Sequence, residues 1–153
     1  MDEKRFDEWN EQAKILHDKD RQRDFKEREV WWYCAGENIG HEINGKGPFF
    51  LRPILIIRKY GSQSFFGVPL SSRIAGGRWF AEILVRGEKS CVLLSQAGSF
   101  SVNRLHGRIC RLSPAEFDVI CAKLQELLFK ITPEKSSTPT FKDEVDDCNA
   151  IDF

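Results

Sequence analysis

The chain has 153 residues with 23 basic and 23 acidic side chains, and 41% of its residues are hydrophobic, so it is long enough to bury a core as one domain. No apolar run approaches the roughly 20 residues that span a bilayer, and the start, Met1-Asp2-Glu3-Lys4-Arg5, lacks the apolar stretch of a secretion signal. The five cysteines are scattered without a CxxC pair, which argues against structural zinc and predicts reduced thiols in the cytoplasm.

The balanced total charge hides an uneven distribution along the chain. Residues 30–132 carry seven acidic and thirteen basic side chains, a net charge of +6. Residues 1–29 carry ten acidic and eight basic side chains, and residues 133–153 carry six acidic and two basic. A basic domain between acidic flanks favours an anionic partner, of which nucleic acid is the commonest. Ordinary surface charge is the alternative explanation.

Residues 6–25 predict a charged amphipathic helix, because apolar residues recur there at helical spacing. The positions concerned are Phe6, Trp9, Ala13 and Leu16. The apolar stripe is narrow, so we expect the helix to pack on the domain with Trp9 as an anchor rather than as a ligand contact. This segment, residues 1–28, precedes the main domain.

From Val30 onwards the composition changes to short apolar runs separated by turn residues. We expect strands at Val30–Cys34, Pro53–Arg58, Ser64–Val68, Trp79–Val85 and Ser90–Leu94. The four branched residues after Pro53 predict a strand that is covered on both faces. Short strands at such tight spacing are typical of a small barrel or sandwich, not of a parallel sheet.

The end of the domain carries the clearest local signal. Ser113-Pro114-Ala115-Glu116 is a capping box with proline at the first helical position. An apolar stripe follows over about four turns, at Phe117, Ile120, Cys121, Leu124 and Leu128. The domain therefore spans residues 29–132. Residues 133–153 are rich in proline, serine and acidic side chains, and we expect a flexible acidic tail there.

A glycine-rich loop, beginning at Gly45, delivers Arg52 to the start of the second strand. Pro53 fixes its own φ and pushes Arg52 towards an extended conformation, so the guanidinium should lie where the loop becomes the strand. A permanently charged fork on a rigid edge suits the binding of phosphate. An arginine that merely faces solvent is the alternative.

The order of several short motifs resembles the PemK/MazF family of toxins from type II toxin–antitoxin systems. The resemblance covers about residues 29–129, and the charged N-terminal helix resembles an extension found in one branch of the family. The motifs are, in order, Glu29-Val30-Trp31-Trp32, Asn38-Ile39-Gly40-His41-Glu42, Arg52-Pro53-Ile54-Leu55-Ile56-Ile57, Val68-Pro69-Leu70-Ser71-Ser72, Leu94-Ser95-Gln96 and Asn103-Arg104-Leu105.

The resemblance implies a mainly β fold, a small SH3-like barrel of the CcdB and MazF kind with a helix before it and a capped helix after it. It also implies a cytoplasmic homodimer that cleaves single-stranded RNA without a metal or other cofactor. In such enzymes the ribose 2′-OH attacks the adjacent phosphate and leaves a cyclic phosphate and a 5′-hydroxyl. The implied protein partner is an antitoxin, and contact with DNA would come only through the antitoxin complex.

The catalytic pair implied by the resemblance is Arg52 and Ser71. A guanidinium does not readily deprotonate, so we expect Arg52 to act as an electrostatic clamp on the phosphate rather than as a proton donor. Ser71 can donate one more hydrogen bond, although a hydroxyl at a strand end also commonly bonds to its own backbone. His41 is a candidate acceptor for the 2′-OH proton, with an ordinary surface histidine as the alternative.

Six further residues are candidate RNA contacts: Glu42, Lys46, Phe49, Phe50, Gln96 and Arg104. Lys46 is equally compatible with a solvent-exposed charge. The two phenylalanines could stack on bases or close the mouth of the barrel. Gln96 and Arg104 match the family pattern.

The segment between Gln96 and Arg104 departs from the family pattern, because Ala97-Gly98-Ser99-Phe100-Ser101 lacks an arginine and a carboxylate that relatives usually carry there. Ser95 also stands where some relatives have an aspartate. Two other functions therefore stay open. One is a non-enzymatic poison of DNA gyrase, as in the related CcdB group, and the other is a family member that binds RNA or antitoxin without turnover.

Overall fold

The strand β3 (Ser64–Ser71) organises the sheet, because three other strands pair with it. In the computed structural model, which describes residues 3–130, one edge of β3 pairs with β2 (Leu51–Tyr60). The other edge is shared: Ser64–Gly67 pair with β6 (Gly98–Ser101), and Leu70 and Ser71 pair with β5 (Glu88–Leu93). Strand β3 therefore belongs to two parts of a bent antiparallel sheet.

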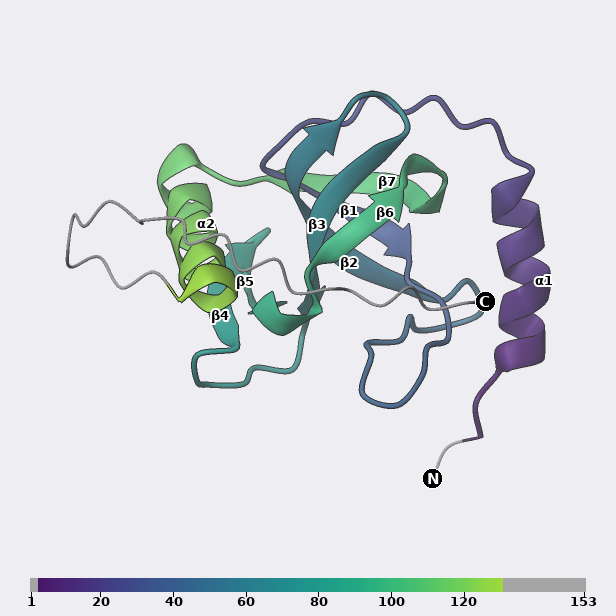
Figure 1. Cartoon of the computed structure of the whole chain (residues 1–153), viewed down its shortest axis with the longest axis horizontal. Coiled ribbons are helices and arrows are strands. Elements are labelled where there is room, and N and C mark those ends of the chain that lie inside the picture. Colours follow the sequence, from purple (N-terminus) through teal and green to yellow (C-terminus); the bar gives the residue numbers. More distant parts are fainter. Residues whose placement is uncertain (1–2, 131–153) are drawn as a thin grey trace, which may run out of the picture.

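The complete sheet has seven strands in the order β4-β5-β3-β2-β1-β7, with β6 on β3. The remaining strands are β1 (Glu29–Cys34), β4 (Phe80–Val85) and β7 (Leu105–Arg111). Short 3-10 turns, Leu94–Gln96 and Val102–Arg104, lie on either side of β6. Helices α1 (Phe6–His17) and α2 (Pro114–Phe129) lie on opposite sides of the curled sheet (Figure 1). The mainly β prediction is confirmed.

Alternation of side chains along β2 gives the domain two separate cores. Ile54 and Ile56 face one core, which lies inside the curled sheet and contains aromatic residues of β1 and β3 together with Phe25. Leu55 faces the other core, which the apolar side of α2 covers. All three of these β2 residues are fully buried, as expected of a strand covered on both faces.

The N-terminal helix is shorter than the sequence predicts, since it ends at His17 rather than near Phe25. After Leu16 the apolar residues lose their helical spacing, and the chain runs on without regular structure. Phe25 instead enters the inner core, where its ring lies 5.7 Å from that of Phe65. Burial of this aromatic ring outweighs continuation of a charged helix, because an isolated helix is only marginally stable in water.

Two strands, β6 and β7, were not expected from the sequence. Their segments contain glycine, serine and charged residues, and long-range pairing with β3 and β1 gives them their extended form. The five expected strands are all present, with small shifts at their ends. The capping box of α2 is also present: Ser113 Oγ accepts a hydrogen bond from the Glu116 amide at 3.3 Å, and the Glu116 carboxylate accepts one from the Ser113 amide.

The sequence also predicts that the chain has no membrane-spanning segment and that its cysteines are reduced. Within residues 3–130, no helix is long and apolar enough to cross a membrane. In the same range Cys34, Cys91, Cys110 and Cys121 are free thiols, and the first two are buried. Cys148 and the predicted tail, residues 133–153, lie outside the described residues.

Candidate active site

Arg52 is one of the few buried charged residues, with 6% of its surface exposed. Its Nε donates a hydrogen bond to the carbonyl oxygen of Asn44 at 2.7 Å, and its Nη1 donates one to the carbonyl oxygen of Leu70 at 3.2 Å. The guanidinium therefore joins the loop before β2 to the end of β3. Burial lowers the pKa of Arg52 below its usual value, yet an arginine side chain stays protonated in proteins.

The two bonds leave part of the Arg52 fork available to a ligand. A guanidinium has five N–H donors, and among the described residues only two of those of Arg52 have a protein acceptor. Within residues 3–130 no fully enclosed side-chain nitrogen or oxygen lacks a partner, so the unpaired Nη2 group keeps contact with solvent. Arg52 lines a cleft of about 830 Å³.

Strand register brings Ser71 beside Arg52. Ile54 lies opposite Pro69 in the β2–β3 pair, and continuing this antiparallel register by two residues places Ser71 next to Arg52. Ser71 is half-buried and lines the same cleft. Its Oγ accepts a hydrogen bond from the Arg73 amide at 3.2 Å. The backbone bond expected as the alternative is thus present, but it leaves the hydroxyl hydrogen free to donate.

The cleft has a basic lining with an aromatic surface. Lys46 and Arg86 add positive charge to that of Arg52, and Glu88 is the acidic residue among the lining side chains. The indole of Trp32 is 42% exposed and also lines the cleft. Cations beside an exposed aromatic ring suit a phosphate with an attached base.

His41 and His106 have different positions relative to this cleft. His41 is exposed, and its backbone oxygen accepts a hydrogen bond from Gln96 Nε2 at 3.2 Å. It is absent from the residues that line the cleft in the described part of the chain, whereas His106 of β7 lines it. The sequence analysis missed His106. Alternation with the buried Leu105 would have indicated an outward side chain, but only once β7 was recognised as a strand.

Gln96 and Glu42 shape the loop that precedes Arg52. Gln96 Oε1 accepts a hydrogen bond from the Ile43 amide at 3.2 Å, and its Nε2 donates to the loop at His41, so one side chain holds two loop positions. The Glu42 carboxylate accepts a bond from the Ile39 amide at 3.1 Å. Both residues line a second, smaller hollow of about 440 Å³.

Arg104 lines that smaller hollow too. Its Nη1 donates to the carbonyl oxygens of Cys34 at 2.9 Å and Ala35 at 3.2 Å, where β1 ends. Burial lowers the pKa of Arg104, and burial raises the pKa of Tyr33, which lies between the two arginines in the inner core, to about 12. The Tyr33 phenol is therefore neutral near pH 7 and is not a proton acceptor there.

The two adjacent phenylalanines have different surroundings. Phe49 is 55% exposed, whereas Phe50 is 1% exposed. Phe50 has a positive φ of 52° and packs edge-on against Trp9, with 5.4 Å between ring centroids. Its buried ring offers no face on which a base can stack. Of the two roles expected for the phenylalanines, base stacking and packing inside the protein, Phe50 therefore has the second. Stacking of a base on Phe49 stays a proposal. Lys46, the other candidate contact in this loop, is exposed and lines the cleft.

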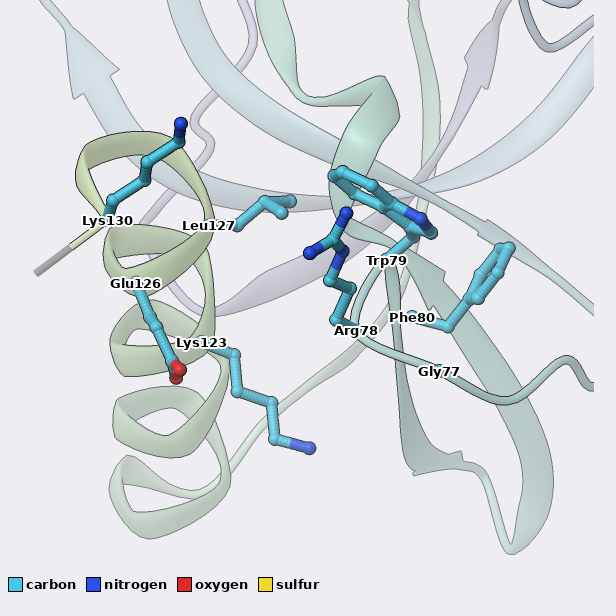
Figure 2. Close-up of a pocket in the computed structure, with 8 residues that line it drawn as sticks. All are labelled: Gly77, Arg78, Trp79, Phe80, Lys123, Glu126, Leu127 and Lys130. Carbon is cyan, nitrogen blue, oxygen red and sulfur yellow. The ribbon is translucent and has the colours of Figure 1, made fainter. Parts of the chain in front are cut away.

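A third hollow, of about 490 Å³, lies between α2 and the segment before β4 (Figure 2). The Arg78 guanidinium stacks on the Trp79 ring, 4.4 Å from its centroid. Lys123 and Glu126 of α2 and Lys130, which caps the end of α2, lie opposite. None of the sequence-predicted site residues lines it. In residues 3–130 there is also no cluster of three or more histidine, cysteine or acidic side chains that could hold a metal ion.

Comparison with known proteins identifies the family. The model of the PemK-like, MazF-like toxins of type II toxin–antitoxin systems matches residues 26–128. The chain belongs to this family. The similarity predicted from the short motifs is confirmed, and the protein is a toxin of the MazF kind. No protein in the curated collection matches the chain.

Solved structures of MazF proteins share the fold at low sequence identity. MazF from Deinococcus radiodurans superposes with a TM-score of 0.56 at 19% identity, covering 68% of this chain and 96% of that one. A MazE–MazF complex from the same organism gives 0.51 at 18% identity, with 72% and 98% covered. An endoribonuclease in complex with its cognate antitoxin from a mycobacterial species gives 0.50 at 13% identity, with 67% and 92% covered.

We predict that Gln96→Ala loosens the loop before Arg52, because it removes both bonds at His41 and Ile43. The loss of two hydrogen bonds should lower the free energy of unfolding by about 1–2 kcal/mol, and the Ile43 amide should exchange its hydrogen faster. Gln125→Ala, on the exposed side of α2, is the control. Unchanged exchange at Ile43 would show that Gln96 does not hold the loop.

Proposed function

We propose that this toxin is a metal-independent endoribonuclease that cleaves single-stranded RNA in the cytoplasm. The observation that supports the proposal most is the basic cleft in which the partly free Arg52 fork and the Ser71 hydroxyl lie side by side. Family membership is consistent with it, since a structural relative is described as an endoribonuclease.

The proposed reaction forms a bond between the 2′-oxygen and phosphorus and breaks the bond between phosphorus and the 5′-oxygen. The 2′-OH gives up its proton, and the leaving 5′-oxygen takes up a proton from water to become the 5′-hydroxyl. Negative charge increases on the two non-bridging oxygens as this happens. Arg52 would donate hydrogen bonds to one of these oxygens. Ser71 would donate a hydrogen bond to the same oxygen or to the second one. Because Arg52 is already fixed by Asn44 and Leu70, little reorganisation is needed at the moment of reaction, and such donors contribute several kcal/mol.

The proton of the 2′-OH needs an acceptor, and the cleft contains one suitable imidazole. His106 lines the cleft with Arg52 and Ser71, whereas His41 lies on the loop outside it. We therefore favour His106 over His41 in this role. The unprotonated nitrogen of an imidazole can accept a proton from a hydroxyl within hydrogen-bond reach.

Binding of RNA would use the remaining residues of the cleft and its rim. Lys46 and Arg86 would contact neighbouring phosphates, and Phe49 and Trp32 present exposed rings to bases. Gln96, Glu42 and Arg104 would act mainly by holding the backbone around the site. An antitoxin is the proposed protein partner, by analogy with the solved complexes, and the family implies a homodimer that contacts DNA only through the antitoxin.

We predict that wild-type protein cleaves labelled single-stranded RNA in EDTA and that Arg52→Lys cleaves at least about 100-fold more slowly, because lysine cannot reproduce the bidentate fork. Ser71→Ala should slow cleavage by about tenfold or more. This small substitution should leave the fold intact, so the test does not depend on the stability of the Arg52 variant alone. Arg78→Lys, at the third hollow, is the control. Absence of cleavage by the wild type would contradict the proposal and favour a gyrase poison or a binding protein without turnover.

We further predict that His106→Gln lowers kcat by about 100-fold, whereas His41→Gln leaves it unchanged. The measurement is kcat of the wild type and both variants on the same labelled RNA in EDTA. A loss of activity in the His41 variant alone would reverse the assignment.

A further inference from the structure

Helix α1 lies outside the part of the chain that the family model matches, which begins at residue 26. In the structure it stands beside the barrel, next to the loop that runs from β1 to β2 (Figure 1). This loop, residues 36–50, leads directly to Arg52 and is called the 36–50 loop below. The contacts between this loop and α1 indicate that the helix does more than cover apolar surface.

Two cations just before α1, Lys4 and Arg5, bind both ends of the 36–50 loop. Lys4 Nζ donates a hydrogen bond to the carbonyl oxygen of Asn38 at 3.1 Å and lies 3.3 Å from the Glu37 carboxylate. Arg5 Nη2 donates to the carbonyl oxygen of Gly47 at 3.2 Å, and its Nε lies 4.0 Å from Glu37. The Glu37 side chain is only 8% exposed, so these ion pairs are partly shielded from water.

Trp9 makes the central apolar contact between α1 and the loop. Its ring packs edge-on against Phe50, and the Arg5 guanidinium lies 4.3 Å from the centroid of the Phe50 ring. Trp9 also presses on Gly36: a Cβ at this position would lie 2.6 Å from the indole. The first and last residues of the loop are thus both held by one side chain of α1.

The opposite side of the loop is held by the candidate active site. Arg52 bonds to the Asn44 carbonyl, and Gln96 bonds to Ile43 and His41. The loop therefore forms a layer between α1 and the guanidinium. It has little regular structure of its own, apart from one bridge between Lys46 and Leu51. Hydrogen bonds within the loop fold it on itself, since Asn38 bonds to Asn44 and Ile43 and the Gly45 amide bonds to the Gly36 carbonyl. The contacts with α1 and with the candidate active site then fix this folded loop relative to Arg52.

We propose that α1 is a positioning element of the cleavage reaction: Trp9 and Arg5 hold the 36–50 loop in the conformation that aligns Arg52 with the scissile phosphate. The inference rests on the proposed ribonuclease function. Trp9 and Arg5 are not among the described residues that line the cleft, so they would act through the loop, as positioning residues. Loss of their contacts shifts Asn44, and with it the guanidinium, while Lys46 and Arg86 still attract the RNA.

The experiment compares Trp9→Ala and Arg5→Gln with wild-type full-length protein, using labelled single-stranded RNA in EDTA and hydrogen exchange without RNA. Because a displacement of about 1 Å can cost about 100-fold in rate, kcat should fall at least about tenfold, with KM changed less than about threefold. Amides of residues 37–47 should exchange faster. Trp9→Phe, which keeps an aromatic ring on Phe50, should restore most of kcat.

Two controls separate positioning from general loss of stability. Ile15→Ala changes a residue of the same helix that is 51% exposed, and Leu124→Ala weakens the core under α2. All variants are assayed below their unfolding temperatures, and both controls should keep wild-type kcat.

The outcomes distinguish this inference from the function on which it rests. Suppose that Arg52→Lys abolishes cleavage but Trp9→Ala has the kcat of the wild type, or its loop amides exchange hydrogen at the wild-type rate. The positioning role is then wrong, and the ribonuclease assignment stands. If Leu124→Ala loses as much kcat as Trp9→Ala, the effect is general destabilisation and the inference is again wrong. If the wild type does not cleave RNA, both proposals fail.

Discussion

The buried guanidinium of Arg52 is the interaction on which the site depends. A charge removed from water is costly unless it is hydrogen-bonded, and here the carbonyl oxygens of Asn44 and Leu70 provide that compensation. The Asn44 carbonyl belongs to a loop and the Leu70 carbonyl to the end of a strand. The pairing of the strands alone does not determine the position of either one. The arginine can therefore lie at the cleft only when the loop and β3 are in place, and it in turn holds them together.

This arrangement relates a structural role to a chemical one. The hydrogen bonds that make burial of Arg52 tolerable also fix its side chain at the cleft that Ser71 lines, where the proposed reaction would use both groups. A fixed donor of this kind stabilises charge without further reorganisation, which is the basis of electrostatic catalysis. The same dependence extends outwards through the 36–50 loop to Trp9, so a residue of the N-terminal helix belongs to the support of the site.

Local patterns in the sequence predicted the elements whose signals are local. The capped helix at Ser113 and the buried strand after Pro53 are examples, and family motifs paired Arg52 with Ser71. Strands β6 and β7 were missed because pairing partners far along the chain determine them. For the same reason His106 was missed. Phe49 and Phe50 are chemically identical neighbours, and only a positive φ and the position of α1 bury one of them.

The central claim is that Arg52 and Ser71 donate to the non-bridging oxygens of the scissile phosphate, and sulfur substitution tests it most directly. The two phosphorothioate diastereomers of one RNA substrate would be cleaved separately in EDTA, by the wild type and by Ser71→Ala. The account predicts that one diastereomer is cleaved much more slowly by the wild type and that this difference shrinks in the variant, because sulfur is a weaker hydrogen-bond acceptor. Equal wild-type rates for both diastereomers would contradict it.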